Sequence, residues 1–342
     1  MATLNYTQRL KNLQTRKFNQ RLNESALSNS FDRYDIPENV KYMVESMRPI
    51  DKKYNDATLQ ASENVRTHLE RELRLHFGRD YRTQGSVICG TNIQLHSDID
   101  LLSIIARYFY LHPELPNTDP YTDSDPAVDI EQLRSQAVKI MKTYYDTVDD
   151  SGAKSILIYN KNLRRKVDIV FAYWYNTSDY HKTNDEYHRG VQLYDFVSRV
   201  KQGADYPFAH IRNVNWKGDS TNDGSRRGIR LLKNLKADSD YKIDLSSFQL
   251  TAIVHAIENS KLNYSTGSEW TIAKAVSDEM KMIIELPSYR QRVKSPNGTE
   301  YPFTDDKTVP EIKKLKADLD ELLVDTAKEL HSQIVNRAIL TY

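Results

Sequence analysis

The chain contains a single cysteine, Cys89, and this scarcity excludes an intramolecular disulfide framework and any zinc site built from several cysteines. It also lacks a charge excess, because 48 Lys and Arg residues face 47 Asp and Glu residues for a formal net charge of +1. This balance argues against a protein coated with nucleic acid, which would need a large basic excess. A local basic groove is still compatible with it.

Long apolar runs are missing as well. No window approaches the 18 or more apolar residues of a membrane span, and the first residues, MATLNYTQRLKNLQTRK, lack the apolar stretch of a secretory signal. Apolar residues nevertheless make up 39% of the 342 residues, enough for two domains of about 150 residues each. We therefore expect a cytoplasmic globular protein without a membrane partner.

Hydrophobic periodicity predicts the main elements. Pro49–Phe77 is predicted to form one long helix, because apolar residues recur there every three or four positions. Strands are expected at Val87–Cys89 and Asp98–Ile105, and a helix at Ile130–Tyr144. Ile156–Tyr159 and Val167–Trp174 predict a hairpin, and helices follow from about residue 190, with candidates at Val191–Val200, Gly224–Ala237, Ser246–Asn259, Thr271–Glu285 and Lys307–Ala338.

The pattern predicts an α+β fold, with a mixed β-sheet and a helical C-terminal lobe. We expect an N-terminal helical extension at residues 1–48, a core with the long helix at residues 49–190, and the helical lobe at residues 191–342.

Two carboxylates stand two residues apart in an apolar run, at Asp98 and Asp100. Side chains at positions i and i+2 of a strand project from the same face, and two neighbouring carboxylates repel unless a cation lies between them. Mg²⁺ suits such hard oxygen ligands, and Mn²⁺ is an alternative. A triplet of this kind is weak alone, because many are solvated strand edges. Twelve positions before Asp98, Gly85-Ser86 adds a turn at which backbone N–H groups and a hydroxyl can approach a polyphosphate.

A third carboxylate, Asp168, lies in the apolar segment Val167–Phe171, where a lone charge is costly to bury. One interpretation is an Asp on an edge strand that pairs with a neighbouring Arg. The other is a strand that brings Asp168 beside Asp98 and Asp100. Three carboxylates that converge on metal ions suit phosphoryl or nucleotidyl transfer.

These residues together resemble the polymerase-β-type nucleotidyltransferases, and more narrowly the bacterial cGAS/DncV-like nucleotidyltransferases (CD-NTases). The resemblance covers about residues 45–335 and includes the long helix, which is similar to the family's spine helix. It also includes Lys233 on a helix and the later Ser246-Ser247-Phe248. In the family, the lysine and a serine of that pair touch the donor triphosphate, which implies this role for Lys233 and Ser247. The alternative is that Lys233 and Lys236 form a solvated helix face and that Ser246 is only an N-cap.

The resemblance implies a catalytic, metal-binding triad of Asp98, Asp100 and Asp168, with Gly85, Ser86, Lys233 and Ser247 on the nucleotide. It implies that ATP or other NTPs are joined into a cyclic di- or oligonucleotide messenger in anti-phage defence. Such a messenger needs a downstream effector, and a regulatory protein partner is compatible with it. No obligate nucleic acid is expected. The rival hypotheses are a nucleotidyltransferase that modifies tRNA or protein, and a non-catalytic nucleotide-binding module. Cys89 is expected to be a buried apolar residue, and His96 a loop histidine without a role.

Overall fold

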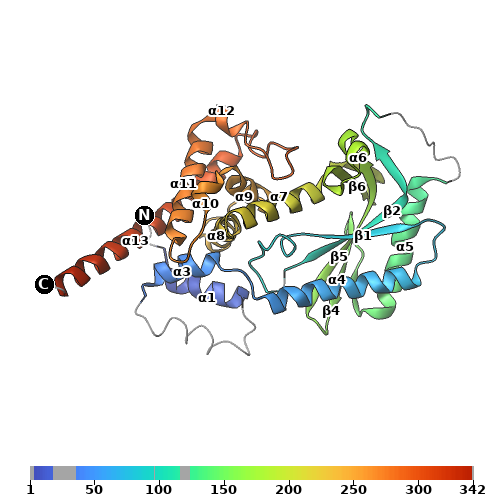
Figure 1. The fold of residues 1–342 in the computed structure, drawn as a ribbon. Coiled ribbons are helices and arrows are strands. Elements are labelled where there is room, and N and C mark those ends of the chain that lie inside the picture. Colours follow the sequence, from blue (N-terminus) through green and yellow to red (C-terminus); the bar gives the residue numbers. More distant parts are fainter. Residues whose placement is uncertain (1–3, 18–35, 96, 116–123, 341–342) are drawn as a thin grey trace. The chain divides into compact units, whose positions relative to one another are not determined.

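The computed structural model describes residues 4–17, 36–95, 97–115 and 124–340, with the backbone alone from residue 330 onward (Figure 1). Its contacts divide the chain into two compact units. Unit 1 comprises Met1–Ile50, Thr91–Leu95 and Val214–Tyr342, and unit 2 comprises Asp51–Gly90 and His96–Asn213. The domain limits that the sequence suggests at residues 48 and 190 stay a prediction.

Unit 2 is built on a mixed sheet whose described strands follow the order β1-β2-β5-β4-β3, with β6 paired to β5 and β7 paired to β6. Strands β2 and β5 are parallel, and the other neighbours are antiparallel. The α+β class is therefore confirmed. The strands are β1 (Arg79–Gln84), β2 (Ile99–Leu111), β3 (Thr147–Asp149), β4 (Ser155–Asn160), β5 (Arg165–Asn176), β6 (Arg189–Asp195) and β7 (Val200–Asp205), and the short helices α6 (Ser178–Thr183) and η1 (Glu186–His188) precede β6.

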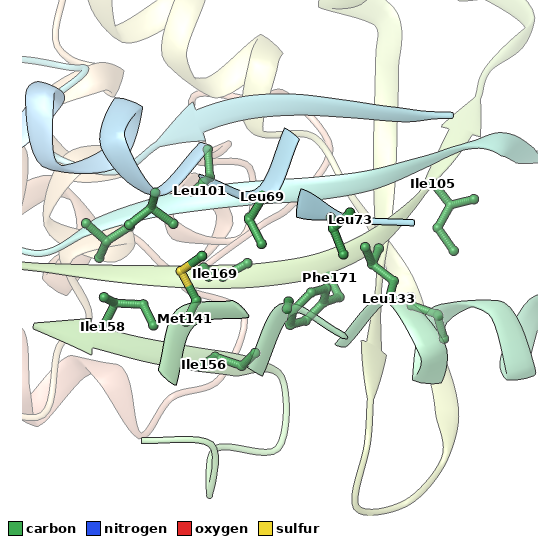
Figure 2. Close-up of a cluster of buried hydrophobic side chains, with 14 of the residues drawn as sticks. Leu69, Leu73, Leu101, Ile105, Leu133, Met141, Ile156, Ile158, Ile169 and Phe171 are labelled. Carbon is green, nitrogen blue, oxygen red and sulfur yellow. The ribbon is translucent and has the colours of Figure 1, made fainter. Parts of the chain in front are cut away.

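Two helices, α4 (Lys52–Glu72) and α5 (Pro126–Tyr144), cover one face of this sheet (Figure 2). Alternate residues of β2 and β5 point into the core that they enclose, among them Leu101, Ile169 and Phe171, all with 1% exposure or less. Helix α4 is the predicted long helix, but it is shorter than expected. The Asp51 side chain caps its first turn by accepting a hydrogen bond from the Lys53 N–H, and the backbone becomes extended at Leu73.

The other face of the sheet carries the intervening residues of the same strands. Leu102 and Ile104 of β2 pack there with Ala172 and Trp174 of β5. Because side chains alternate along a strand, Asp100 and Asp168 also belong to this second face, at the end where β2 and β5 begin. The fold thus separates its main apolar core from the face that bears the carboxylates.

Two expectations about local structure are wrong. Val191–Val200 is not a helix but contains most of β6, where Val191 and Leu193 pair with the aromatic-rich end of β5. Tertiary pairing of β-branched and aromatic residues decides the outcome there. The second error is the strand at Val87–Cys89, which lies in a series of turns after β1. The hairpin of β4 and β5 is as expected, and β1 was not foreseen.

Unit 1 is helical in its described part. Its helices are α1 (Tyr6–Lys17), α3 (Glu38–Met47), α8 (Gly224–Asp238), α9 (Ser247–Ala256), α10 (Asn259–Leu262), α11 (Glu269–Glu285), α12 (Pro287–Arg290) and α13 (Thr308–Leu340), and it includes the residues of α7 (Pro207–Ser220) from Val214 on. Residues 18–35 of the predicted N-terminal extension lie outside the described chain. Among the helices whose residues are described, none combines the length and apolarity needed to cross a membrane.

Candidate active site

The parallel pairing of β2 and β5 places two predicted site residues side by side. The Cα atoms of Asp100 and Asp168 are direct partners in the register, so both side chains leave the sheet on the same face. Strand β5 has β2 on one side and β4 and β6 on the other, so it is not an edge strand. This excludes the interpretation of Asp168 as an edge-strand carboxylate, and the Arg165 guanidinium instead donates to Thr58 Oγ1 at 2.8 Å.

The two carboxylates are partly buried, and their electrostatics reflect it. The pKa of Asp100 is raised from 3.8 to about 6. Burial is the main cause, a hydrogen bond from Gln84 acts in the opposite direction, and the negative charges of Asp168 and Asp98 add to the rise. Burial also raises the pKa of Asp168, with a smaller upward contribution from Asp98. The three acids therefore act on one another, and a cation shared among them would relieve the repulsion.

Asp98 and the Gly85 turn lie at the same end of the sheet. Asp98 is exposed and immediately precedes β2, and Gly85 follows directly on β1. Gly85 has a φ of +110°, which favours glycine, and a Cβ at this position would lie 3.9 Å from the Asp98 carbonyl oxygen. Ser86 opens the turns that continue to Gly90. Cys89 is buried in this segment as expected, whereas His96 lies outside the described residues.

Two neutral hydrogen-bond donors lie beside the carboxylates, and the sequence pattern did not predict either of them. Gln84 Nε2 donates to Asp100 Oδ2 at 3.2 Å, and Ser155 Oγ donates to Asp168 Oδ1 at 3.3 Å. Each donor comes from the strand next to its acid, β1 for Asp100 and β4 for Asp168. Alternation of apolar and polar residues along β1 would have been the signal for Gln84. The sequence of this strand, RDYRTQ, is too polar to show such an alternation.

The described residues contain no group of three His, Cys, Asp or Glu side chains that is already close enough to hold a metal ion. The donor chemistry nevertheless fits a hard divalent cation, because Asp98, Asp100 and Asp168 offer only carboxylate oxygens. To share an ion, their side chains would have to turn toward one another.

The predicted phosphate contacts Lys233 and Ser247 belong to unit 1. Lys233 is half-buried on α8, and its Nζ donates to the Thr91 carbonyl oxygen at 3.0 Å, so the helix face is not simply solvated. Lys236 Nζ likewise donates to the carbonyl oxygen of Leu245. Ser246 is the N-cap of α9, with its hydroxyl accepting from the Gln249 N–H in a capping box. Ser247 is exposed in the first turn.

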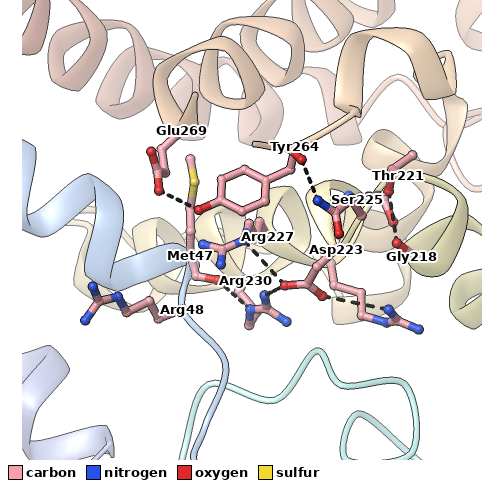
Figure 3. Close-up of polar contacts among 12 residues, drawn as sticks. Met47, Arg48, Gly218, Thr221, Asp223, Ser225, Arg227, Arg230, Tyr264 and Glu269 are labelled. Atoms are coloured by element: carbon pink, nitrogen blue, oxygen red, sulfur yellow. Dashed lines mark hydrogen bonds and ion pairs between the residues drawn. The ribbon is translucent and has the colours of Figure 1, made fainter. Parts of the chain in front are cut away.

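Three arginines near the start of α8, Arg226, Arg227 and Arg230, all have structural partners, and Figure 3 labels two of them. Arg230 is 1% exposed, ion-pairs with Asp223 at 2.6 Å and donates to the Met47 carbonyl oxygen at 2.6 Å. Arg227 lies 3.5 Å from the same carboxylate and 3.9 Å from the centre of the Tyr264 ring. Arg230 therefore connects α8 to the end of α3, and Arg227 connects α8 to the segment before α11.

No family model matches the chain. It is, however, 34% identical over an alignment of 284 residues to a c-di-GMP synthase from a Lachnospiraceae bacterium (strain RUG226), and the match covers 75% of this chain and 80% of that protein. The chain belongs to the bacterial cGAS/DncV-like nucleotidyltransferases, the CD-NTases. The predicted family, and with it the prediction of a nucleotidyltransferase, is confirmed.

Other relatives of this CD-NTase agree. The cyclic dinucleotide synthase CdnE of Yersinia aleksiciae is 29% identical over an alignment of 296 residues, and the match covers 85% of this chain and 77% of that protein. The solved structure of the STING-associated CdnE c-di-GMP synthase from Capnocytophaga granulosa matches with a TM-score of 0.81 at 28% identity, over 95% of this chain and 99% of that one.

Proposed function

We propose that this CD-NTase is a cyclic dinucleotide synthase that joins two NTPs and releases two pyrophosphates. The observation that carries the proposal is the register of β2 and β5, which sets Asp100 opposite Asp168 on one face of the sheet, at the end where the Gly85 turn lies. The relatives named as c-di-GMP synthases support a cyclic product, and they make GTP the first nucleotide to test.

The proposed metal ligands are Asp98, Asp100 and Asp168, which would bind Mg²⁺ or Mn²⁺. Carboxylate oxygens are the ligands that these ions prefer, and the mutual repulsion of the three acids favours a cation among them. A bound divalent ion would supply charge neutralisation for the phosphoryl oxygens during transfer.

The remaining work falls to groups of the chain itself. Gly85 and Ser86 offer backbone N–H groups and a hydroxyl to the donor triphosphate, and Lys233 and Ser247 are proposed to add a cation and a hydroxyl. Asp168 is also the proposed acceptor of the proton from the attacking ribose hydroxyl, because it lies beside Asp100 on the face of the sheet where the ion would bind.

Each transfer forms a bond between the ribose oxygen and the α-phosphorus and breaks the bond from that phosphorus to the leaving pyrophosphate. The first transfer gives a linear dinucleotide. The second closes the ring, with the 5′-triphosphate of the linear product as donor. Positioning and charge neutralisation supply most of the rate in this chemistry.

The proposed role is a second messenger in cytoplasmic anti-phage signalling, read by a downstream effector. The STING-associated relatives support an effector that binds a cyclic dinucleotide. A protein partner that controls the enzyme is compatible with this role.

The test is to incubate the purified protein with GTP alone, ATP alone and all four NTPs, with Mg²⁺ or Mn²⁺, and to look for a product that resists alkaline phosphatase. The matched inactive control is Asp98→Asn. A cyclic product from the wild type alone supports the proposal. Nucleotide transfer only when tRNA or a protein acceptor is added would instead favour the macromolecular nucleotidyltransferase, and NTP binding without turnover would favour the non-catalytic module.

A further inference from the structure

The carboxylate of Asp100 is held by a side chain from the neighbouring strand. Gln84 is the last residue of β1, and its Cα is the direct partner of the Asp100 Cα in the antiparallel register. Directly opposed residues project on the same face of a sheet, and this brings the amide to the acid. The resulting bond runs from Gln84 Nε2 to Asp100 Oδ2 at 3.2 Å.

The position of Gln84 at the end of a paired strand restricts its side chain to the neighbourhood of Asp100. The five preceding pairs, from Arg79 with Ile105 to Thr83 with Leu101, fix β1 against β2, and the backbone turns away immediately afterwards at Gly85. Gln84 therefore lies at the end of a paired strand, between the sheet and the turn that is proposed to receive the triphosphate. Its side chain is half-buried, and this limits the conformations that the amide can sample.

The chemical nature of the donor matters as much as its position. An amide is neutral, so it orients a carboxylate without cancelling the negative charge that a cation needs. An Arg or Lys at the same place would orient the acid but compete with the cation. The bond also engages only one carboxylate oxygen, Oδ2, and a carboxylate has acceptor capacity at both.

We propose that Gln84 is a positioning residue that fixes the Asp100 carboxylate for the divalent cation of nucleotidyl transfer. This inference rests on the proposed function, because it assumes that Asp100 is a metal ligand. Residues that hydrogen-bond to metal ligands orient them, and their loss typically lowers metal affinity or activity by about 10-fold to 100-fold.

The experiment measures Mn²⁺ binding by electron paramagnetic resonance in the presence of a non-hydrolysable GTP analogue. It compares the wild type, Gln84→Met, Gln84→Ala, Asp100→Asn and Thr83→Val. Methionine has a similar length but no N–H donor. Thr83→Val is the matched control, because it lies on the same strand but projects toward the opposite face.

We expect Mn²⁺ to bind about tenfold more weakly to both Gln84 variants and at wild-type strength to Thr83→Val. In turnover assays, the Gln84 variants should need more Mg²⁺ for half-maximal rate and recover most of kcat at saturating Mg²⁺. A residue that only stabilised the strand would not give that recovery. Alanine at this half-buried strand end keeps the test possible if the Met variant does not fold.

The outcomes separate the two proposals. Wild-type protein that binds no Mn²⁺, or Asp100→Asn that binds as well as wild type, would contradict the metal assignment of the proposed function. The other outcome is that Asp100→Asn loses Mn²⁺ binding as expected, while both Gln84 variants keep the Mn²⁺ affinity and the Mg²⁺ dependence of the wild type. That result would overturn only the positioning role of Gln84.

Discussion

Replacing Asp100 by Asn should stop synthesis and, in the absence of metal, stabilise the fold. The pKa of Asp100 is raised from 3.8 to about 6, chiefly by burial. One pKa unit corresponds to about 1.36 kcal/mol, so keeping this carboxylate ionised at pH 7.5 costs the folded state up to about 3 kcal/mol. Asn removes the charge and keeps an oxygen that can accept from Gln84.

The sign and pH range follow from the same shift. The unfolded chain releases this proton near pH 4 and the folded chain near pH 6, so the cost is absent below pH 4 and complete above about pH 6. The stabilisation of Asp100→Asn should therefore grow as the pH rises from 4 to 7. For a unit of this size, each kcal/mol shifts Tm by about 2–4 °C, so the upper limit is about 12 °C.

The assay is thermal denaturation with a chelator across this pH range, with Asp98→Asn as control. Asp98 is exposed, and its replacement should change stability by less than about 0.5 kcal/mol. Adding Mg²⁺ and a non-hydrolysable NTP analogue should stabilise the wild type but not Asp100→Asn, because only the wild type gains binding energy. A variant that is less stable than wild type at pH 7.5, or a difference that does not vary with pH, would refute the reasoning.

Four further outcomes are expected. Asp168→Asn should lower turnover about 100-fold or more while some Mg²⁺–NTP binding persists, because its proposed role is on the acceptor hydroxyl; affinity and rate measured on one preparation test this, and an undiminished rate would contradict it. Lys233→Ala should raise the KM for NTP about tenfold with a smaller change in kcat. Unchanged kinetics would mean that the lysine only stabilises the fold through its hydrogen bond to Thr91. Asp223→Asn should lower the free energy of unfolding by about 3 kcal/mol in urea titrations, because it leaves the buried Arg230 without its counter-charge. The control is Asp219→Asn, which should change this free energy little because Asp219 is an exposed partner of Arg226. Initial rates at about 150 mM salt should not depend on duplex DNA or RNA; strict dependence that is lost at higher salt would reinstate a nucleic-acid sensor.

Sequence periodicity predicted the elements that bury a continuous apolar stripe. Helix α5 and the hairpin of β4 and β5 are examples, because their patterns of period 3.6 and 2 survive in the fold. The boundaries of α4 were overestimated, because apolar residues such as Ile50 and Phe77 continue the pattern outside the helix and are buried by other contacts.

Strand β1 and the donors beside the acids lay beyond this kind of reasoning. Strand β1 is polar because it lies at a sheet edge, and none of its residues is fully buried. The role of Gln84 depends on its cross-strand partner, Asp100. The strand register brings these two residues together from 16 positions apart, and no local sequence pattern connects them. The proximity of Asp100 to Asp168 could be inferred, because an isolated charge in an apolar strand is costly to bury and so indicates a neighbouring site that uses it. The contact of Lys233 could not be inferred in this way, because the amphipathic pattern of α8 does not indicate its hydrogen bond to the Thr91 carbonyl oxygen.

The interleaved composition of the two units has a consequence for synthesis on the ribosome. All of unit 2 has been translated by Asn213, whereas α1 and α3 of unit 1 must wait for partners encoded much later. The hydroxyl of Tyr42 donates to Asp238 at 2.9 Å, a residue 196 positions further on. At translation speeds of about 5–20 residues per second, that wait lasts about 10–40 s. During this time the nascent chain exposes Tyr42, Met43 and Met47, which the finished fold buries almost completely. Protection by a chaperone should therefore matter more for the N-terminal helices than for the mixed sheet of unit 2.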